Sequence, residues 1–171
     1  MRFLILTMLL TLTACTGVPE GITPVDGFEL NRYLGTWYEI ARLDHRFERG
    51  LTDITAEYSL RDDGSVRVIN SGYDIEQGER HAAEGKAHFV GAKDVGSLEV
   101  SFWGPFYGAY NIIALDKTAY RYVMITGNSR DYLWILSRTP TLDRATLDDL
   151  LVQANALGFA TQDLIFSQPH P

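Results

Sequence analysis

The sequence predicts an all-β protein, an eight-stranded antiparallel up-and-down barrel with a C-terminal α-helix packed outside it and a short ninth strand. The composition favours strands and tight turns over helices, because 171 residues include nine Tyr, eight Phe and fifteen Gly. The apolar runs come at even spacing and are separated by turn signals, a pattern typical of such a barrel. The first run opens with Gly35-x-Trp37, in which a glycine permits a sharp turn and an indole can then seal one end of a closed sheet.

Residues 1–14 predict a lipoprotein signal peptide, because one basic residue precedes an apolar run too short to span a bilayer. The run ends in Leu12-Thr13-Ala14-Cys15, which resembles a bacterial lipobox with cleavage before the cysteine. We therefore expect Cys15 to carry acyl chains; the alternative is an ordinary secretory signal that happens to contain a cysteine. Thr16 follows where an Asp would suggest retention in the inner membrane, so the resemblance implies the outer membrane.

Residues 15–28 predict a lipidated cysteine and a semi-extended tether, because Gly and Pro recur there without periodicity. Residues 29–171 then form the barrel domain. A short helical turn over residues 29–34 leads into the first strand. Alternation along that strand places Trp37, Glu39 and Ala41 on one face.

A charged loop over residues 43–52 follows, and Phe47 in its middle either touches a ligand or pins the loop down; we favour the pin. Asp63-Gly64 between two alternating runs is a strong hairpin signal. The seven strands expected after the loop cover residues 54–60, 66–73, 82–90, 97–103, 110–115, 120–126 and 132–138. Apolar residues at helical spacing then predict a helix over residues 143–157, ended by Gly158, and residues 163–166 predict the short ninth strand beside the first.

Three parts of the chain carry a resemblance to a known family. Gly35-x-Trp37 followed by Tyr38-Glu39, the turn Asn128-Ser129-Arg130-Asp131-Tyr132 and Arg138 at the end of a late strand match the signatures of the lipocalins. The stretch as a whole, about residues 28–168, resembles the bacterial outer-membrane lipoproteins of that family. The resemblance implies that Gly35, Trp37 and Arg138 close the barrel, with the guanidinium over the indole contributing about 0.5–2 kcal/mol.

The resemblance also implies a ligand cavity inside the barrel. It suggests that Tyr132, Trp134 and Leu136 face inward on the last strand, Asn70 on the third, and Ser101 and Trp103 on the fifth. The expected cavity is mainly aromatic, and its polar groups are Glu39, Asn70, Ser101 and Asn111. That mixture suits a ligand with a long apolar part and one polar head.

Two features of this interior stay open in the sequence. Glu39 could bind a polar head group, act as a base or pair with a buried arginine, and we favour the pair because an unpaired buried charge is costly. The aromatic residues could fill the barrel completely instead of enclosing a void. The family resemblance favours the open barrel.

The sequence gives no support to an enzyme and indicates no catalytic residue, metal site or cofactor. The four histidines lack zinc-like spacing, no Gly-x-Ser-x-Gly or phosphate-binding motif is present, and the only thiol is Cys15 at the expected anchor. The net charge of −7 argues against nucleic acid as a partner.

Two functions remain. The first is a lipid-binding protein anchored through acylated Cys15 to the periplasmic face of the outer membrane. It would store or transport fatty acids, lysophospholipids or phospholipids in envelope maintenance. The second is a filled-barrel envelope lipoprotein that acts through protein–protein contacts. Apolar residues of the loop Gly104-Pro105-Phe106-Tyr107-Gly108 motivate it, and the same loop could support a homodimer.

Overall fold

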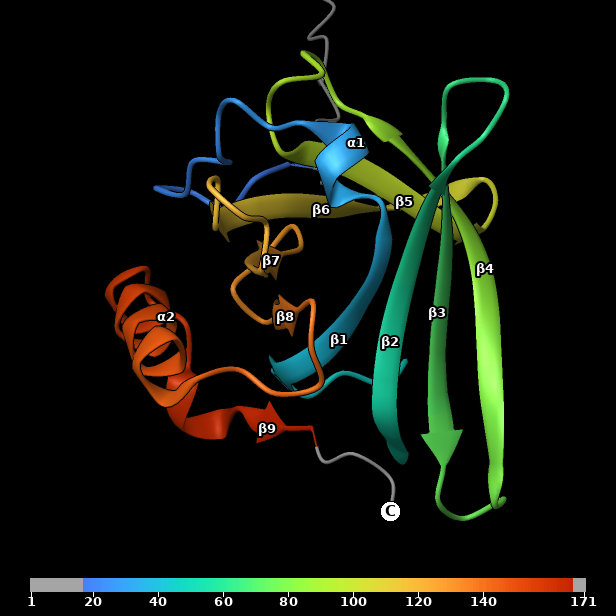
Figure 1. The fold of residues 1–171 in the computed structure, drawn as a ribbon, viewed down its shortest axis with the longest axis vertical. Coiled ribbons are helices and arrows are strands. Elements are labelled where there is room, and N and C mark those ends of the chain that lie inside the picture. Colours follow the sequence, from blue (N-terminus) through green and yellow to red (C-terminus); the bar gives the residue numbers. More distant parts are fainter. Residues whose placement is uncertain (1–16, 168–171) are drawn as a thin grey trace, which may run out of the picture.

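The computed structural model describes residues 17–167, so the expected signal peptide and Cys15 lie outside the described residues. The elements in chain order are α1 (Leu30–Tyr33), β1 (Gly35–Arg42), β2 (Leu51–Leu60), β3 (Val66–Asp74), β4 (Glu79–Phe89), β5 (Ser97–Trp103), β6 (Phe106–Leu115), β7 (Tyr122–Thr126), β8 (Leu133–Ser137), α2 (Arg144–Ala156) and β9 (Ile165–Phe166), with a 3-10 turn at Thr161–Asp163. From β1 to β8 each strand pairs antiparallel with the next, and β1 also pairs with β8, which closes an eight-stranded ring (Figure 1). The predicted fold class is confirmed.

Two apolar cores lie on opposite faces of the barrel wall: the barrel core lies inside the barrel, and the outer core lies outside it. Val123 and Ile125 of β7 point into the barrel, whereas Met124 between them points outward. The outer core lies beneath α2, which contributes the buried Leu150 and Ala154 and lies beside β7 and β8 (Figure 1). The helix begins after Asp143, whose side chain accepts a hydrogen bond from the Thr146 backbone N–H at 3.0 Å.

The alternation expected along β1 is wrong for Ala41. The register between β1 and β8 shifts between Glu39 and Ala41, which marks a β-bulge. The bulge breaks the period of two, so Ala41 joins the outer core and Arg42 contacts Glu39. A bulge has no clear sequence signal here, and its effect is to bring a second charged side chain next to Glu39.

The last strand covers an edge of β1 that β2 leaves open. β1 pairs with β2 only over Gly35–Tyr38, where the partners are Tyr58 to Thr55. Beyond that point Ala41 and Arg42 pair with Phe166 and Ile165 of β9. The Ser167 backbone N–H also donates to Ile40 O at 3.0 Å.

The segment expected to be a tether packs on the barrel within the described residues. Val25 N–H donates to Ile112 O at 2.9 Å, and Val25 O accepts from Gly96 N–H at 2.8 Å. Ile22 is buried in the outer core, and Phe28 is buried in the barrel core. Residues 17–28 therefore form part of the domain surface instead of a free linker.

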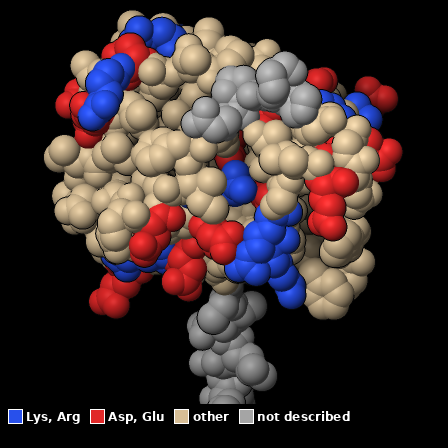
Figure 2. All heavy atoms as spheres, turned by 90° about the horizontal axis from the view of Figure 1, so that it is seen from below, with Lys and Arg blue, Asp and Glu red and all other residues tan. Residues whose placement is uncertain are grey.

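The antiparallel ring gives the barrel two distinct ends. One end, called the closed end below, holds α1 and the turns 61–65, 90–96 and 116–121; the other, called the mouth end, holds the turns 43–50, 75–78, 104–105 and 127–132. Seen from below, acidic and basic side chains lie next to one another and uncharged areas separate these groups (Figure 2). Within residues 17–167, no helix is long and apolar enough to cross a membrane.

Candidate functional site

The closed end is sealed by Trp37, which is fully buried. Its indole N–H donates to Tyr33 O at 2.8 Å, and the guanidinium carbon of Arg138 lies 3.9 Å from the centre of its ring. Arg138 also donates to the carbonyl oxygens of Thr36 (3.0 Å), Arg32 (2.7 Å) and Tyr120 (3.3 Å). One cation thus covers the indole and satisfies carbonyl groups at the end of α1, where helical partners are lacking.

Gly35 allows this arrangement because two conditions meet at its α-carbon. Its φ is +96°, a conformation that residues with side chains rarely adopt. A Cβ there would also lie 3.4 Å from Nη1 of Arg138. The structure therefore brings together the three residues that the family resemblance grouped.

A cavity of about 50 Å³ lies inside the barrel next to this seal. Its walls are aliphatic and aromatic side chains with a single amide; the lining residues are Phe28, Leu30, Tyr33, Tyr58, Val66, Val68, Asn70, Ala87, Leu98, Val100, Phe102 and Tyr110. Room of this size holds several water molecules and is well below the roughly 300–1,000 Å³ of a typical pocket for a drug-sized ligand. An acyl chain therefore fits only if lining side chains move.

Three tyrosine hydroxyls meet at this cavity. The Tyr110 hydroxyl lies 2.5 Å from that of Tyr33 and 2.8 Å from that of Tyr58. Burial raises the pKa of Tyr58 to about 12 and the pKa values of Tyr33 and Tyr110 well above their usual range, so all three stay protonated. Sequence reasoning missed this group, because nothing in the chain separates these three tyrosines from the other six.

The expected cavity residues take several different places. Asn70 lines the cavity, and its buried Oδ1 has no hydrogen-bond partner among the described residues. Asn111 is buried outside the cavity lining, where it accepts from Ser97 Oγ at 2.9 Å and donates to Gly127 O at 3.2 Å. Trp134 packs against the barrel core, and Tyr132 stacks on it at 6.0 Å between ring centres.

The placement expected on β5 is corrected by the structure. Leu98, Val100 and Phe102 line the cavity, so Ser101 and Trp103 belong to the opposite face of the strand. Ser101 is buried there, whereas Trp103 is 80% exposed beside the 104–105 turn. The resemblance fixed the wrong alternate set, because period-two alternation leaves the choice of face undetermined.

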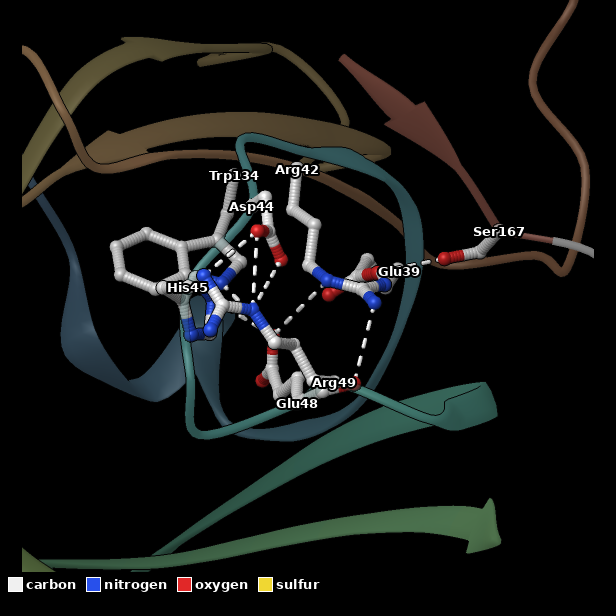
Figure 3. Close-up of polar contacts among 8 residues, drawn as sticks. All are labelled: Glu39, Arg42, Asp44, His45, Glu48, Arg49, Trp134 and Ser167. Carbon is white, nitrogen blue, oxygen red and sulfur yellow. Dashed lines mark hydrogen bonds and ion pairs between the residues drawn. The ribbon is translucent and has the colours of Figure 1, made fainter. Parts of the chain in front are cut away.

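A second polar group lies where β1 and the 43–50 turn meet (Figure 3). Oε1 of Glu39 lies 2.6 Å from Nη1 of Arg42, which is the pairing favoured among the three roles for this carboxyl, and it accepts from Ser167 Oγ at 2.5 Å. Burial, and after it the charge of Glu48, raises the pKa of Glu39 to about 7 despite the opposing effect of Arg42.

Glu48 holds the 43–50 turn against the barrel. Its Oε2 lies 2.9 Å from Nε2 of His45 and accepts from the indole N–H of Trp134 at 3.2 Å, while its backbone carbonyl accepts from Arg42 at 3.1 Å. Burial favours a higher pKa for Glu48, but the hydrogen bond and charge of His45, with Trp134 and Arg42, outweigh it and lower that pKa. These contacts pin the turn, whereas the expected pin, Phe47, is 62% exposed.

This polar group shows no sign of a metal centre. Within residues 17–167, no three side chains of the ligating types lie close enough to hold an ion. The site thus has two parts. One is an apolar cavity that the three tyrosine hydroxyls adjoin. The other, called the Glu39–Glu48 cluster below, is the buried group of Glu39, Arg42, His45 and Glu48.

Comparisons with known proteins agree with this architecture. The family described as Lipocalin-like domain matches residues 28–169. The chain is 52% identical to the outer membrane lipoprotein Blc of Vibrio cholerae serotype O1, covering 97% of this chain and 96% of the relative. It is 55% identical to the Blc lipoprotein of Escherichia coli strain K12, covering 88% and 84%.

Solved structures show the same fold at lower identity. The structure of insecticyanin from the tobacco hornworm Manduca sexta has a TM-score of 0.72 at 21% identity, covering 90% of this chain and 87% of that one. Two other relatives were matched by sequence. Temperature-induced lipocalin-1 of Arabidopsis thaliana is 35% identical, covering 79% of this chain and 76% of the relative. Apolipoprotein D of Bos taurus is 34% identical, covering 76% of this chain and 72% of the relative. The sealed barrel, the outer helix and these matches together show that the chain belongs to the lipocalin family.

Proposed function

We propose that this protein is a lipid-binding lipocalin of the outer membrane, anchored through acylated Cys15 on the periplasmic face. It stores or transports fatty acids, lysophospholipids or phospholipids in envelope maintenance. The observation that carries the proposal is the apolar cavity between the Trp37 seal and the Glu39–Glu48 cluster. Similarity to proteins named outer membrane lipoprotein Blc supports the location.

The size of the cavity sets a condition on this function. Because the cavity measures about 50 Å³, a chain can enter only as the barrel core rearranges. Phe102 is a candidate for that movement, since it lines the cavity and is only partly buried. Each Å² of apolar surface that the ligand removes from water would then contribute on the order of 25 cal/mol, before the cost of ordering it.

A narrower chamber can test this proposal directly. Ala87 lines the cavity from β4, whereas Ala82 on the same strand is exposed. We expect Ala87→Leu to abolish binding of a fluorescent fatty acid to the soluble form beginning at Thr16, and Ala82→Leu to leave it unchanged. Overpacking costs about 1–3 kcal/mol, so circular dichroism must first show that both variants are folded.

Lipid analysis completes the test. Native mass spectrometry of protein purified without detergent should show a bound lipid in the wild type and a smaller amount in Ala87→Leu. An empty barrel that also fails to take up fatty acids would exclude the lipid-binding proposal.

The small cavity and the exposed 103–108 segment favour a second candidate function, a filled-barrel envelope lipoprotein that binds another protein. Every residue from Trp103 to Gly108 is exposed. A protein that copurifies in fixed ratio with no lipid signal would support that candidate. A homodimer through the same segment would appear in the same native mass spectrum.

A further inference from the structure

The N-terminal segment is held at the mouth end of the barrel by Arg130 of the 127–132 turn. Nη2 of Arg130 donates to Glu20 O at 2.6 Å, and Nε donates to Leu157 O at 2.6 Å. A charge-assisted pair of this kind fixes the backbone near Glu20 against the turn. The chain then runs along the barrel to the closed end, where Phe28 N–H donates to Asp94 O at 2.8 Å.

This path limits where an anchor on Cys15 can reach. Cys15 lies five steps along the chain from Glu20, and a fully extended chain spans at most about 3.5 Å per step, or about 17 Å in all. The strands that separate the two ends are longer; the ten residues of β2 span about 33 Å. Acyl chains on Cys15 would therefore enter a membrane beside the mouth end.

The mouth end also exposes large apolar side chains. Phe47 in the 43–50 turn is 62% exposed, and Ile75 in the 75–78 turn is 68% exposed. Trp103 and Phe106, which pair across the 104–105 turn, are each 80% exposed. The six residues from Trp103 to Gly108 include no charged side chain. Exposed apolar clusters mark interaction surfaces, and tryptophan is enriched where membrane meets water.

We propose that the mouth end docks on the bilayer that holds the acyl chains of Cys15, with Trp103, Phe106 and Ile75 in its interfacial layer. A lipid then passes between bilayer and barrel without crossing open water. The inference rests on the acylation of Cys15 in the proposed function. The two observations that support it, the Arg130 contacts and the exposed side chains, are independent of each other.

Single thiol labels can test the orientation in the lipidated full-length protein. Acylation occupies Cys15, the one natural thiol, so an introduced cysteine is the only reactive one. An environment-sensitive fluorophore is attached at Ile75→Cys or Phe106→Cys for the mouth end. Leu60→Cys and Val90→Cys serve as controls, because these side chains are 53% and 47% exposed and adjoin the closed-end turns.

The labelled proteins are reconstituted in vesicles of phosphatidylethanolamine and phosphatidylglycerol whose acyl chains carry bromine. We expect bromine to quench the two mouth-end labels and leave the two closed-end labels bright. Quenching of the closed-end labels instead, or of none of the four, would overturn the proposal. A spectral shift without vesicles that grows with protein concentration would assign the surface to a second copy and would also overturn it.

Two further measurements separate this proposal from the proposed function. Flotation of the protein with the vesicles reports the anchor, and displacement of a fluorescent fatty acid reports the cavity, whichever way the barrel faces.

Arg130→Gln removes the cation that holds Glu20, so we expect weaker quenching at Ile75→Cys with unchanged flotation. In the Arg130→Gln protein the two closed-end labels must stay unquenched. Circular dichroism must also show that the midpoint of unfolding is unchanged.

Discussion

Replacing Glu39 with glutamine should change how stability depends on pH. The folded-state pKa of this carboxyl is about 7, against 4.5 for the ordinary side chain. Between these values the folded protein keeps a proton that the unfolded chain has lost, so the unfolded state binds fewer protons. The free energy of unfolding therefore falls as pH rises through this window. Moving a carboxyl pKa from 4.5 to about 7 corresponds to about 3 kcal/mol.

Glu48 makes stability depend on pH in the opposite direction and in a lower pH range. The pKa of Glu48 is lowered, so Glu48 contributes stability that is lost as pH falls below the ordinary value of 4.5. The combined contribution of these two carboxyls to stability should thus be largest near pH 4.5, where the two windows meet. Glu39→Gln removes only the loss of stability that occurs as pH rises from 4.5 to about 7.

Urea unfolding at a series of pH values measures the effect. The free energy of unfolding of Glu39→Gln minus that of the wild type should rise by about 2–3 kcal/mol between pH 5 and pH 8. The neutral amide resembles the protonated carboxyl that the wild type carries below pH 7, and the attraction between Arg42 and ionised Glu39 is already included in the pKa of about 7. Glu57→Gln, at an exposed glutamate of β2, is the control and should give a flat difference. A flat or falling difference for Glu39→Gln would refute the reasoning.

Three other substitutions test the sealed end and the cavity, each by urea unfolding. Arg138→Met leaves several carbonyl groups and the Trp37 ring without their cation, and should cost about 2–4 kcal/mol; a loss below about 1 kcal/mol would contradict the sealing role. Tyr110→Phe leaves the hydroxyls of Tyr33 and Tyr58 unpaired and should cost about 1–3 kcal/mol, whereas Tyr107→Phe outside the barrel should cost little; equal losses would count against the hydroxyl group. Gly35→Ala places a side chain at φ +96° against Arg138, and should cost about 1–3 kcal/mol, more than Gly91→Ala at φ +94° with open space around it; the reverse order would show that the Arg138 contact is not limiting.

The sequence predicted most elements because local signals agree with the global fold. The Asp63-Gly64 turn marks the hairpin of β2 and β3, and the helix stripe containing Leu150 and Ala154 marks the outer face of the barrel. Strand ends were less certain: the strand expected from residue 82 begins at Glu79, and the one expected from residue 110 begins at Phe106. The added residues extend hairpins beyond the core, where apolar alternation gives little signal.

Facing and pairing of side chains were harder to predict. The bulge after Glu39 moved Ala41 to the outer core, and the face of β5 was assigned to Ser101 and Trp103 instead of Leu98, Val100 and Phe102. Both errors follow from the same physics, since a one-residue change in register exchanges the two faces of a strand. The Glu48 contacts with His45 and Trp134 join residues up to 86 positions apart and have no local signature.

The pairing of β9 with β1 has a consequence for handling this protein. Two residues of β9 and the backbone of Ser167 occupy hydrogen-bonding groups of β1, at Ile40, Ala41 and Arg42, that would otherwise face solvent. A stop codon before Ile165 would uncover that row of donors and acceptors, which is a template for strand addition from another molecule. The apparent molecular mass of such a truncated chain, measured by light scattering, should therefore rise with concentration. For the same reason an affinity tag is better placed away from β9.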